Sequence, residues 1–289
     1  MTTLARTLAC LAWMTGLALA ATPNQGDPLM QDERYARGWH ALTQLAPERA
    51  QAVQDNLADI APDLGTFIVA FGYGDIFTRP GLSPALRQTV TIAALTALGN
   101  AAPQLAFHIE AGLATGLSPE EIIEILYVTT VFAGFPAGLN AIATARQVFT
   151  AKHLPVTPPT AHAPSDTDRR QRGLTAVSQS SQNAGQHVLD ALADIAPDMA
   201  DFILDFSYGD VISRTVLSPA QKELAMIAAA TARGTMAPQL AVHIKAARQV
   251  GVTRQQIVET IIQMAAYAGF PAAINGMTTA RSALRELGE

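Results

Sequence analysis

The chain has 289 residues, a net charge of −5 and a pI near 5.7. Apolar residues make up 49% of it and charged residues only 15%, a balance that indicates globular rather than disordered protein. The acidic balance and the lack of a Lys/Arg run argue against a nucleic-acid-binding protein, because such proteins need a cationic surface for phosphate. The length is sufficient for two domains, each with its own core.

The first twenty residues form a segment of a different kind. Arg6 supplies a positive charge, residues 8–19 form a short apolar stretch, and Ala18-Leu19-Ala20 is a small-x-small cleavage site. This pattern predicts a secretory signal peptide that is cleaved after Ala20 and leaves a periplasmic or secreted protein free of the membrane. No other stretch approaches the length of a transmembrane helix.

The only cysteine, Cys10, lies inside this predicted leader. We therefore expect a mature protein without disulfides, thiolate nucleophiles or cysteine-containing metal sites. The sequence also has no His-x-x-x-His pair or carboxylate cluster at metal-ligand spacing, no phosphate-binding glycine loop and no nucleophile elbow. These absences argue against a metal site.

Within the first half, four helices follow from capping residues and glycine stops. The first covers 84–98 after Ser83-Pro84 and ends near Gly99. The second runs from Pro103 to just before Gly116, and the third from a capping box at Ser118 to Gly134. The fourth begins at Pro136.

The second half repeats the first at an offset of 135 residues. Leu57–Asp63 returns as Leu192–Asp198, and Ala133–Ala137 returns as Ala268–Ala272. No gap is needed from Arg37 to Arg146, so the repeat indicates duplicated domains rather than a solenoid. We expect an all-α protein with two tandem domains of about six helices each, at 21–151 and 171–289, joined by a Pro-rich linker at 152–170.

Two histidines stand at matching positions, each ending an apolar run: Pro103–His108 and Pro238–His243. Imidazole is the side chain suited to proton exchange near neutral pH. A lone histidine on an apolar helix face is, however, more often a hydrogen-bonded core residue. The four other histidines have no counterpart in the other copy and are predicted to lie on the surface or in the linker: His40, His153, His162 and His187.

Three further pairs of segments repeat and carry polar groups. A loop before the helix of 84–98 is expected to hold Tyr73, Asp75 and Arg79, and its counterpart Tyr208, Asp210 and Arg214. Arginine binds carboxylates with paired hydrogen bonds, so this loop suits a small carboxylated ligand; an Asp–Arg ion pair that pins the loop is the alternative. The same helix carries Arg87 or Lys222 in its first turn, either as a ligand contact or on the surface. Asn140 and Asn275 could reach a ligand or cap a neighbour, and Glu124 and Glu259 are expected to be solvated or paired.

Taken together, these motifs resemble the carboxymuconolactone decarboxylase family. The resemblance rests on Tyr35–Gly38, Phe71–Leu82, Arg87–Ala93, Leu95–Gly99, His108 and Tyr127–Asn140, and it extends with more drift through the second copy. It implies the all-α fold shared with thiol-dependent alkylhydroperoxidases. Where those relatives carry a Cys-x-x-Cys before the histidine, this chain has Ala101 and Gln104, or Met236 and Gln239, so peroxidase chemistry is not expected.

The resemblance implies a cofactor-independent decarboxylase of a carboxylated butenolide or a related small carboxylated lactone or acid. In that interpretation His108 and His243 are catalytic, as proton or hydrogen-bond donors, and Arg79 and Arg214 anchor a substrate carboxylate. The further substrate-binding candidates are Tyr73, Tyr208, Asp75, Asp210, Arg87, Lys222, Asn140 and Asn275. Since family members tend to form six-subunit rings, a trimer of two-domain chains is expected. The alternatives are an exported small-molecule binding protein and a structural assembly subunit of the same fold.

Overall fold

The computed structural model describes residues 32–158, 162, 168–180 and 183–289. Within these ranges the chain forms fourteen α-helices and two π-helices and no strand, which confirms the all-α prediction. No helix in the described part is long and apolar enough to cross a bilayer. The predicted signal peptide and much of the predicted linker lie outside the described residues.

Each copy contributes seven α-helices and one π-helix, more than the six or so expected. The first copy comprises α1 (Glu33–Leu45), α2 (Ala50–Asp55), α3 (Pro62–Phe67), η1 (Ile68–Phe77), α4 (Pro84–Leu98), α5 (Ala102–Ala114), α6 (Pro119–Ala133) and α7 (Phe135–Ala151). The second comprises α8 (Arg169–Ser180), α9 (Ala184–Leu192), α10 (Pro197–Phe202), η2 (Ile203–Ile212), α11 (Pro219–Arg233), α12 (Ala237–Gln249), α13 (Arg254–Tyr267) and α14 (Phe270–Glu286).

The helix starts agree with the capping signals in the sequence. Ser83 accepts a hydrogen bond from the backbone of α4 at 3.3 Å, and Ser118 forms a complete capping box with Glu121 at the start of α6. These bonds satisfy backbone N–H groups that a helix start leaves without partners. Gly99 ends α4 in the left-handed conformation that glycine adopts without strain.

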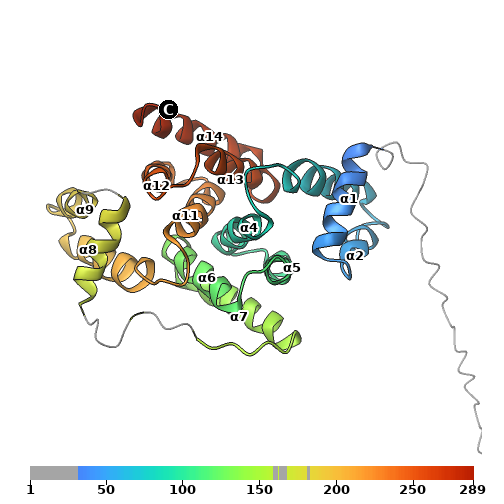
Figure 1. The fold of residues 1–289 in the computed structure, drawn as a ribbon, viewed down its shortest axis with the longest axis horizontal. Helices are drawn as coiled ribbons and strands as arrows, with labels where there is room; N and C mark the ends of the chain where they lie inside the picture. The colour runs from blue at the N-terminus through green and yellow to red at the C-terminus, as the bar shows by residue number, and fades with distance from the viewer. Residues whose placement is uncertain (1–31, 159–161, 163–167, 181–182) are drawn as a thin grey trace, which may run out of the picture.

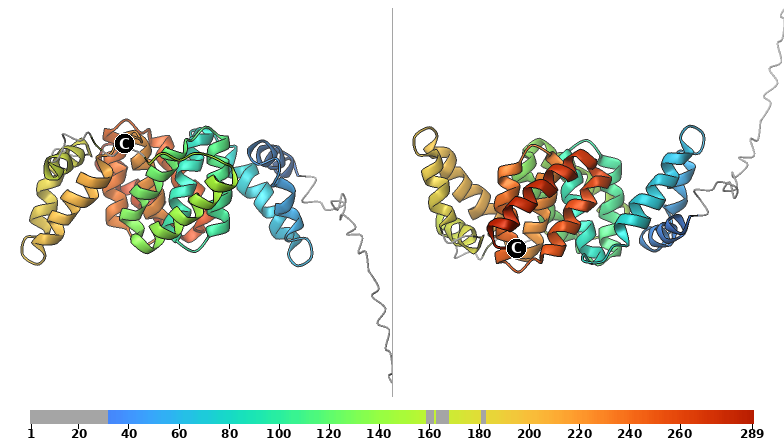
Figure 2. Two further views of the ribbon diagram at one scale, coloured as in Figure 1. Left: turned by 90° about the horizontal axis from the view of Figure 1, so that it is seen from below. Right: turned by 90° about the horizontal axis from the view of Figure 1, so that it is seen from above.

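The helices form a central body with an arm at each end. Helices α4–α7 and α11–α14 make the body, while α1 and α2 lie at one end and α8 and α9 at the other (Figures 1 and 2). Each π-helix joins its arm to the body and reaches the other copy, because η1 contacts α13 and η2 contacts α6. The two copies are therefore interlocked, because each one packs its π-helix against a helix of the other.

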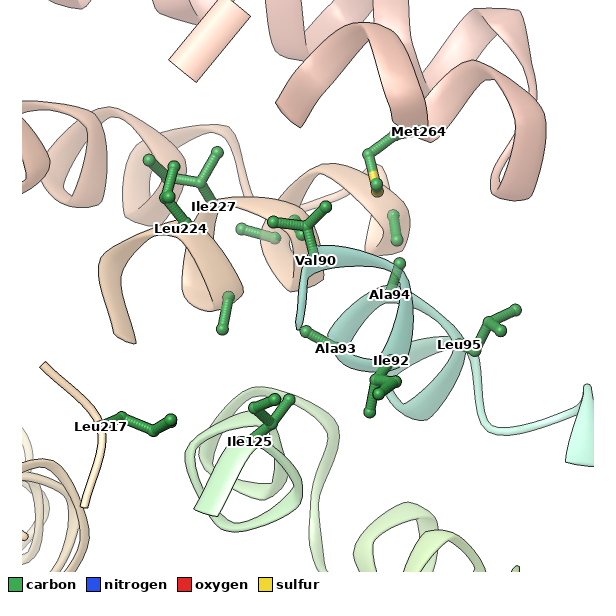
Figure 3. Packing of buried hydrophobic residues seen from close by; sticks show 14 of the residues in the cluster. Val90, Ile92, Ala93, Ala94, Leu95, Ile125, Leu217, Leu224, Ile227 and Met264 are labelled. Carbon is green, nitrogen blue, oxygen red and sulfur yellow. The ribbon is translucent and has the colours of Figure 1, made fainter. Parts of the chain in front are cut away.

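The core lies where α4 of one copy packs against α11 of the other. Every residue of α4 from Arg87 to Ala97 is buried, and so is every residue of α11 from Lys222 to Ala232. Helices buried on all sides need small apolar side chains to approach closely, and both are rich in alanine. Figure 3 shows Val90 and Ala94 of α4 facing the same cluster as Leu224 and Ile227 of α11. The two copies share one hydrophobic core, whereas the sequence predicted one core for each.

The segment predicted as a loop, Tyr73-Gly74-Asp75, is the second half of the π-helix η1. Long π-helices are rare and are commonly associated with functional sites. This one is supported by α1, which packs directly on its backbone: a Cβ on Gly38 would lie 2.0 Å from the carbonyl oxygen of Val69, and one on Gly74 2.2 Å from that of Arg34. The second copy repeats both contacts at Gly173 and Gly209. Glycine is required at these positions because two backbones touch there.

Two arginines at matching positions, Arg79 and Arg214, form ion pairs across the junction between the copies. Arg214, beside η2, donates its Nε to Glu124 of α6 at 2.8 and 2.9 Å, and Arg79, beside η1, bonds in the same way with Glu259 of α13. Glu124 is fully buried and Arg214 only 12% exposed. A buried carboxylate is tolerated only when it is paired in this way, so these bonds fix each π-helix to the other copy.

We predict that Gly74→Ala destabilises the protein, because the new methyl group collides with backbone that cannot move without separating α1 from η1. Gly72→Ala in the same π-helix is the matched control: its Cβ has no atom within 4 Å, and alanine should be neutral or stabilise by up to about 1 kcal/mol. Thermal unfolding followed by circular dichroism checks the contrast. Equal melting temperatures for the two variants would contradict the close-packing argument.

We also predict that Glu124→Gln costs about 3–5 kcal/mol, since it leaves the cation of Arg214 buried without its carboxylate. The control is Glu286→Gln, which breaks the exposed pair with Lys245 and should cost under about 1 kcal/mol. Denaturant unfolding of the two variants measures the difference. A small, equal loss in both would mean that the junction does not depend on this pair.

Candidate functional site

His108 lies where α5 of the first copy meets α13 of the second. Its Nδ1 is 2.9 Å from Oε1 of Gln88 on α4, and its Nε2 is 3.0 Å from the hydroxyl of Tyr267 on α13. Because an amide oxygen only accepts hydrogen bonds, Nδ1 carries the proton and Nε2 accepts one from Tyr267. The site thus exists only when the two copies are packed together.

Aromatic rings enclose this histidine. Phe77 of η1 and Phe107 of α5 have ring centroids 6.0 and 5.1 Å from its own, and Tyr267 meets it edge-on at 5.2 Å. Burial lowers the pKa of His108 to about 3 and raises the pKa of Tyr267 well above its usual value. At neutral pH both side chains are therefore uncharged.

A polar network continues from this histidine along the junction. Arg87, predicted as a surface residue or ligand contact, is only 2% exposed and donates to Oε1 of Gln263 on α13 at 2.8 Å. It also donates to the backbone oxygen of Arg79 at 2.6 Å. Desolvation lowers the pKa of Arg87, and its buried Nε has no hydrogen-bond partner among the described residues. That unsatisfied donor is suited to water or a small ligand atom.

The two arginines expected to anchor a substrate carboxylate are already bound to protein carboxylates. Arg79 makes a two-point contact with Glu259, and Arg214 one with Glu124. Arg79 is nevertheless 41% exposed, and its NH1 takes part in no hydrogen bond within the described ranges. It could thus receive a second carboxylate from outside while Glu259 holds its inner edge.

The His243 site is built in the same way but from different groups. Nδ1 of His243 is 2.9 Å from Oε2 of Glu223 on α11, in place of the amide of Gln88. The ring of Phe132, on α6 of the other copy, stands 5.2 Å away, in place of Tyr267. Tyr208 of η2 lies nearby, and burial, with a smaller contribution from the charge of Glu223, raises its pKa to about 12. Nε2 of His243 has no hydrogen-bond partner among the described residues.

Lys222 takes the place of Arg87 in this second site. Its Nζ donates to the backbone oxygens of Ile212, at 2.7 Å, and Arg214, so it supports the turn after η2 as Arg87 supports the turn after η1. Burial lowers the pKa of Lys222 to about 8. The guanidinium of Arg214 also lies 5.1 Å from the ring centroid of Tyr127.

The remaining predicted residues divide into those at the sites and those away from them. Tyr73 is buried in the aromatic group with Phe77, where burial raises its pKa. Asp75 does not pair with Arg79: it faces α1 and bonds Arg34 and Arg37 at 3.4 and 3.2 Å.

Asp210 likewise bonds Arg169 and Arg172 of α8, so both aspartates fasten the arms because the π-helix turns them away from the histidines. Asn140 and Asn275 are exposed, with no side-chain hydrogen bond in the part of the chain described. Of the four histidines that have no counterpart in the other copy, His40, His153 and His187 are exposed, as predicted, and His162 is half-buried.

Four residues that the sequence did not single out complete the sites: Gln88, Glu223, Tyr267 and Phe132. Gln88 directly follows Arg87, and Glu223 directly follows Lys222. Because Gln88 and Glu223 are different residues at matching positions, a comparison of the two copies can reveal them as an unequal pair. Tyr267 and Phe132 are also an unequal pair at matching positions, but nothing in the sequence shows that Tyr267 faces His108, which lies 159 positions away in the other copy.

One cavity lies away from both His108 and His243. It has a volume of about 690 Å³ and lies between α8 and the turn from η2 to α11, with Arg172, Arg214 and Lys222 among its lining residues. A much smaller one, of about 20 Å³, borders Ala101 and Asn140. The described residues contain no group of three or more His, Cys, Asp or Glu that could hold a metal ion.

Comparisons with known proteins agree with this arrangement. Residues 62–147 and 197–282 each match the model of the carboxymuconolactone decarboxylase family. The 4-carboxymuconolactone decarboxylase of Acinetobacter baylyi is 35% identical over 131 residues, which are 45% of this chain and 96% of that protein. Peroxisomal protein 2 of Schizosaccharomyces pombe is 31% identical over 137 residues, which are 47% of this chain and 62% of that protein.

A solved structure shares the fold. A chain from Burkholderia xenovorans LB400, described as a gamma-carboxymuconolactone decarboxylase subunit, superimposes with a TM-score of 0.54 at 22% identity, covering 87% of this chain and 98% of its own. The family model matches both halves, and nearly the whole of the Acinetobacter relative corresponds to fewer than half of the residues here. The chain therefore belongs to the carboxymuconolactone decarboxylase family, as a tandem pair of family domains.

Proposed function

We propose that the protein is a cofactor-independent decarboxylase of a small carboxylated lactone similar to 4-carboxymuconolactone. The observation that carries the proposal is that each copy places a buried histidine against the other copy, in a chain whose relatives include a named decarboxylase of that lactone. The predicted leader, if it is used, would place this reaction in the periplasm or outside the cell.

The decarboxylation requires few functional groups from the protein. When a carboxylated butenolide loses CO₂, the electron pair of the broken bond passes through the ring into the lactone carbonyl and forms a dienolate. Protonation of a ring carbon then completes the reaction, so the ring itself serves as electron sink. The protein must hold the carboxylate, stabilise the dienolate oxygen and supply one proton.

The side chains divide these tasks between them. Arg79 beside the His108 site and Arg214 beside the His243 site are the candidates for holding a carboxylate. Glu259 occupies only the inner edge of Arg79. The histidines are the candidates for the hydrogen bond or proton, since they are buried where an electrostatic interaction is strong. The aromatic rings around His108 exclude water from it.

We predict that the double variant His108→Gln/His243→Gln loses turnover of 4-carboxymuconolactone by about 10²–10⁴-fold, the usual contribution of acid–base help. Loss of the lactone absorbance, together with release of CO₂, measures it. The control is His40→Gln/His187→Gln, which replaces two exposed histidines and should keep wild-type turnover. Full turnover in the His108/His243 variant would exclude both histidines from the chemistry. Binding without turnover in the wild type would favour the binding-protein alternative.

We further propose that chains assemble through two apolar surface sets at corresponding positions. The first set is Ile60, Leu64 and Phe67 of one arm with Phe270 and Ile274 of α14; the second is Ile195, Met199 and Phe202 with Phe135 and Leu139 of α7. Tilted ring contacts join η1 to α14, between Phe71 and Phe270, and η2 to α7, between Phe206 and Phe135. Large exposed apolar groups that recur in both copies are typical of a subunit interface.

We predict a trimer in solution and a lower mass for Phe67→Glu/Phe202→Glu, because the new charges would be buried in the interface. Light scattering with size-exclusion chromatography measures the mass. Leu287→Glu is the control: it also places a charge on an exposed apolar residue, but one without an apolar counterpart in the other copy, and the trimer should persist. A monomeric wild type would contradict the proposal.

A further inference from the structure

The two histidine sites differ at the group that bonds Nδ1. Gln88 and Glu223 occupy the same position on α4 and α11, and both lie 2.9 Å from their histidine. One is a neutral amide and the other a carboxylate, and both are buried. Almost identical geometry therefore holds two rings in different electrostatic surroundings.

In the His108 site the ring has no proton to give. Its only N–H, on Nδ1, is donated to the amide oxygen of Gln88, and its Nε2 accepts the hydroxyl proton of Tyr267. Arg87 and Glu259, charged residues of the polar network beside this site, bond each other at 3.4 Å. Among the described residues no carboxylate bonds the ring of His108, where it would stabilise a second proton.

In the His243 site Nδ1 has a hydrogen-bond partner, whereas Nε2 has none in the part of the chain that the structure describes. Nδ1–H is donated to the carboxylate of Glu223, an acceptor that stabilises positive charge on the ring. Phe132 stands where Tyr267 stands in the other site, so it offers no hydroxyl to Nε2. The ionisable groups that approach from other elements are Tyr208 of η2 and, beyond Glu223, Lys222 and Glu124.

We propose that the two sites have divergent roles: His243 with Glu223 is the proton-transferring dyad, and His108 is a neutral hydrogen-bonding residue fixed by Gln88 and Tyr267. Glu223 is a positioning residue, because it acts through the ring of His243. The inference deepens the proposed function and rests on it for the identity of the proton acceptor.

The proton balance of the dyad is simple. With both ring nitrogens protonated, Nε2 of His243 delivers its proton to the ring carbon of the dienolate that CO₂ loss leaves behind. The imidazole becomes neutral, keeps Nδ1–H bonded to Glu223, and regains its second proton from water. No other reactant is needed.

The first test reads the ring protons directly, in full-length protein labelled with ¹⁵N-histidine. At the same donor–acceptor distance, a ring N–H bonded to a carboxylate is in a stronger hydrogen bond than one bonded to an amide, so its proton resonates farther downfield. We expect the Nδ1 proton of His243 downfield of that of His108, with assignments from His243→Gln and His108→Gln. Glu223→Gln should move the His243 proton upfield, and Gln88→Glu should move the His108 proton downfield.

The second test measures turnover of 4-carboxymuconolactone. Glu223→Gln keeps the shape of the side chain but removes the charge, and should lower kcat by about tenfold or more with little change in KM. Glu223→Asp keeps the charge and should retain more of kcat than the isosteric amide. Circular dichroism confirms that each variant is folded.

Several outcomes would overturn the proposal. They are equal ring-proton shifts for the two histidines, a His243 shift that Glu223→Gln leaves unchanged, or a kcat that falls more in the aspartate variant than in the glutamine variant. If the wild type turns over no carboxylated lactone, the proposed function fails by itself. In that case the ring-proton comparison still decides whether the two histidines differ as inferred.

Discussion

The structure depends on the packing of α4 against α11. Every residue of α4 from Arg87 to Ala97 and of α11 from Lys222 to Ala232 is buried, and the alanines among them help the two backbones to approach closely. This contact joins the two copies through a single core, so neither half keeps its α4 or α11 covered by itself. Everything that faces the junction is then shielded from water by both copies.

That burial determines what the polar groups at the junction can do. A buried cation or carboxylate needs a partner, and the nearest partners belong to the other copy: Arg79 takes Glu259, and Arg214 takes Glu124. The histidines follow the same rule, because each is placed between a polar group of its own copy and a ring of the other. The sites are thus a consequence of the interlocked core and not of either domain taken separately.

Local signals in the sequence predicted the local structure well. The caps at Ser83 and Ser118 start helices as expected, and the duplicated motifs identify the family and the paired histidines. The π-helix was missed because Tyr73-Gly74-Asp75 reads as a turn, and only the contact of Gly74 with the backbone of α1 shows why glycine is there. The burial of Arg87 was missed because nothing near it in the chain reveals that α11 and α13 cover it.

The partners of the site residues depend on which copy faces which, and this has a consequence for how the sites can change. If the copies were separate and identical, a substitution at the position of Gln88 would alter both sites at once. In the fused chain each site takes its histidine and its Nδ1 partner from one half, and its facing ring from the other. Gln88 therefore affects only the His108 site and Phe132 only the His243 site, although the two residues belong to the same half. Because the two copies are fused in one chain, one site can lose an ionisable group that the other site retains. The shared core of α4 and α11 keeps both sites in the same geometry.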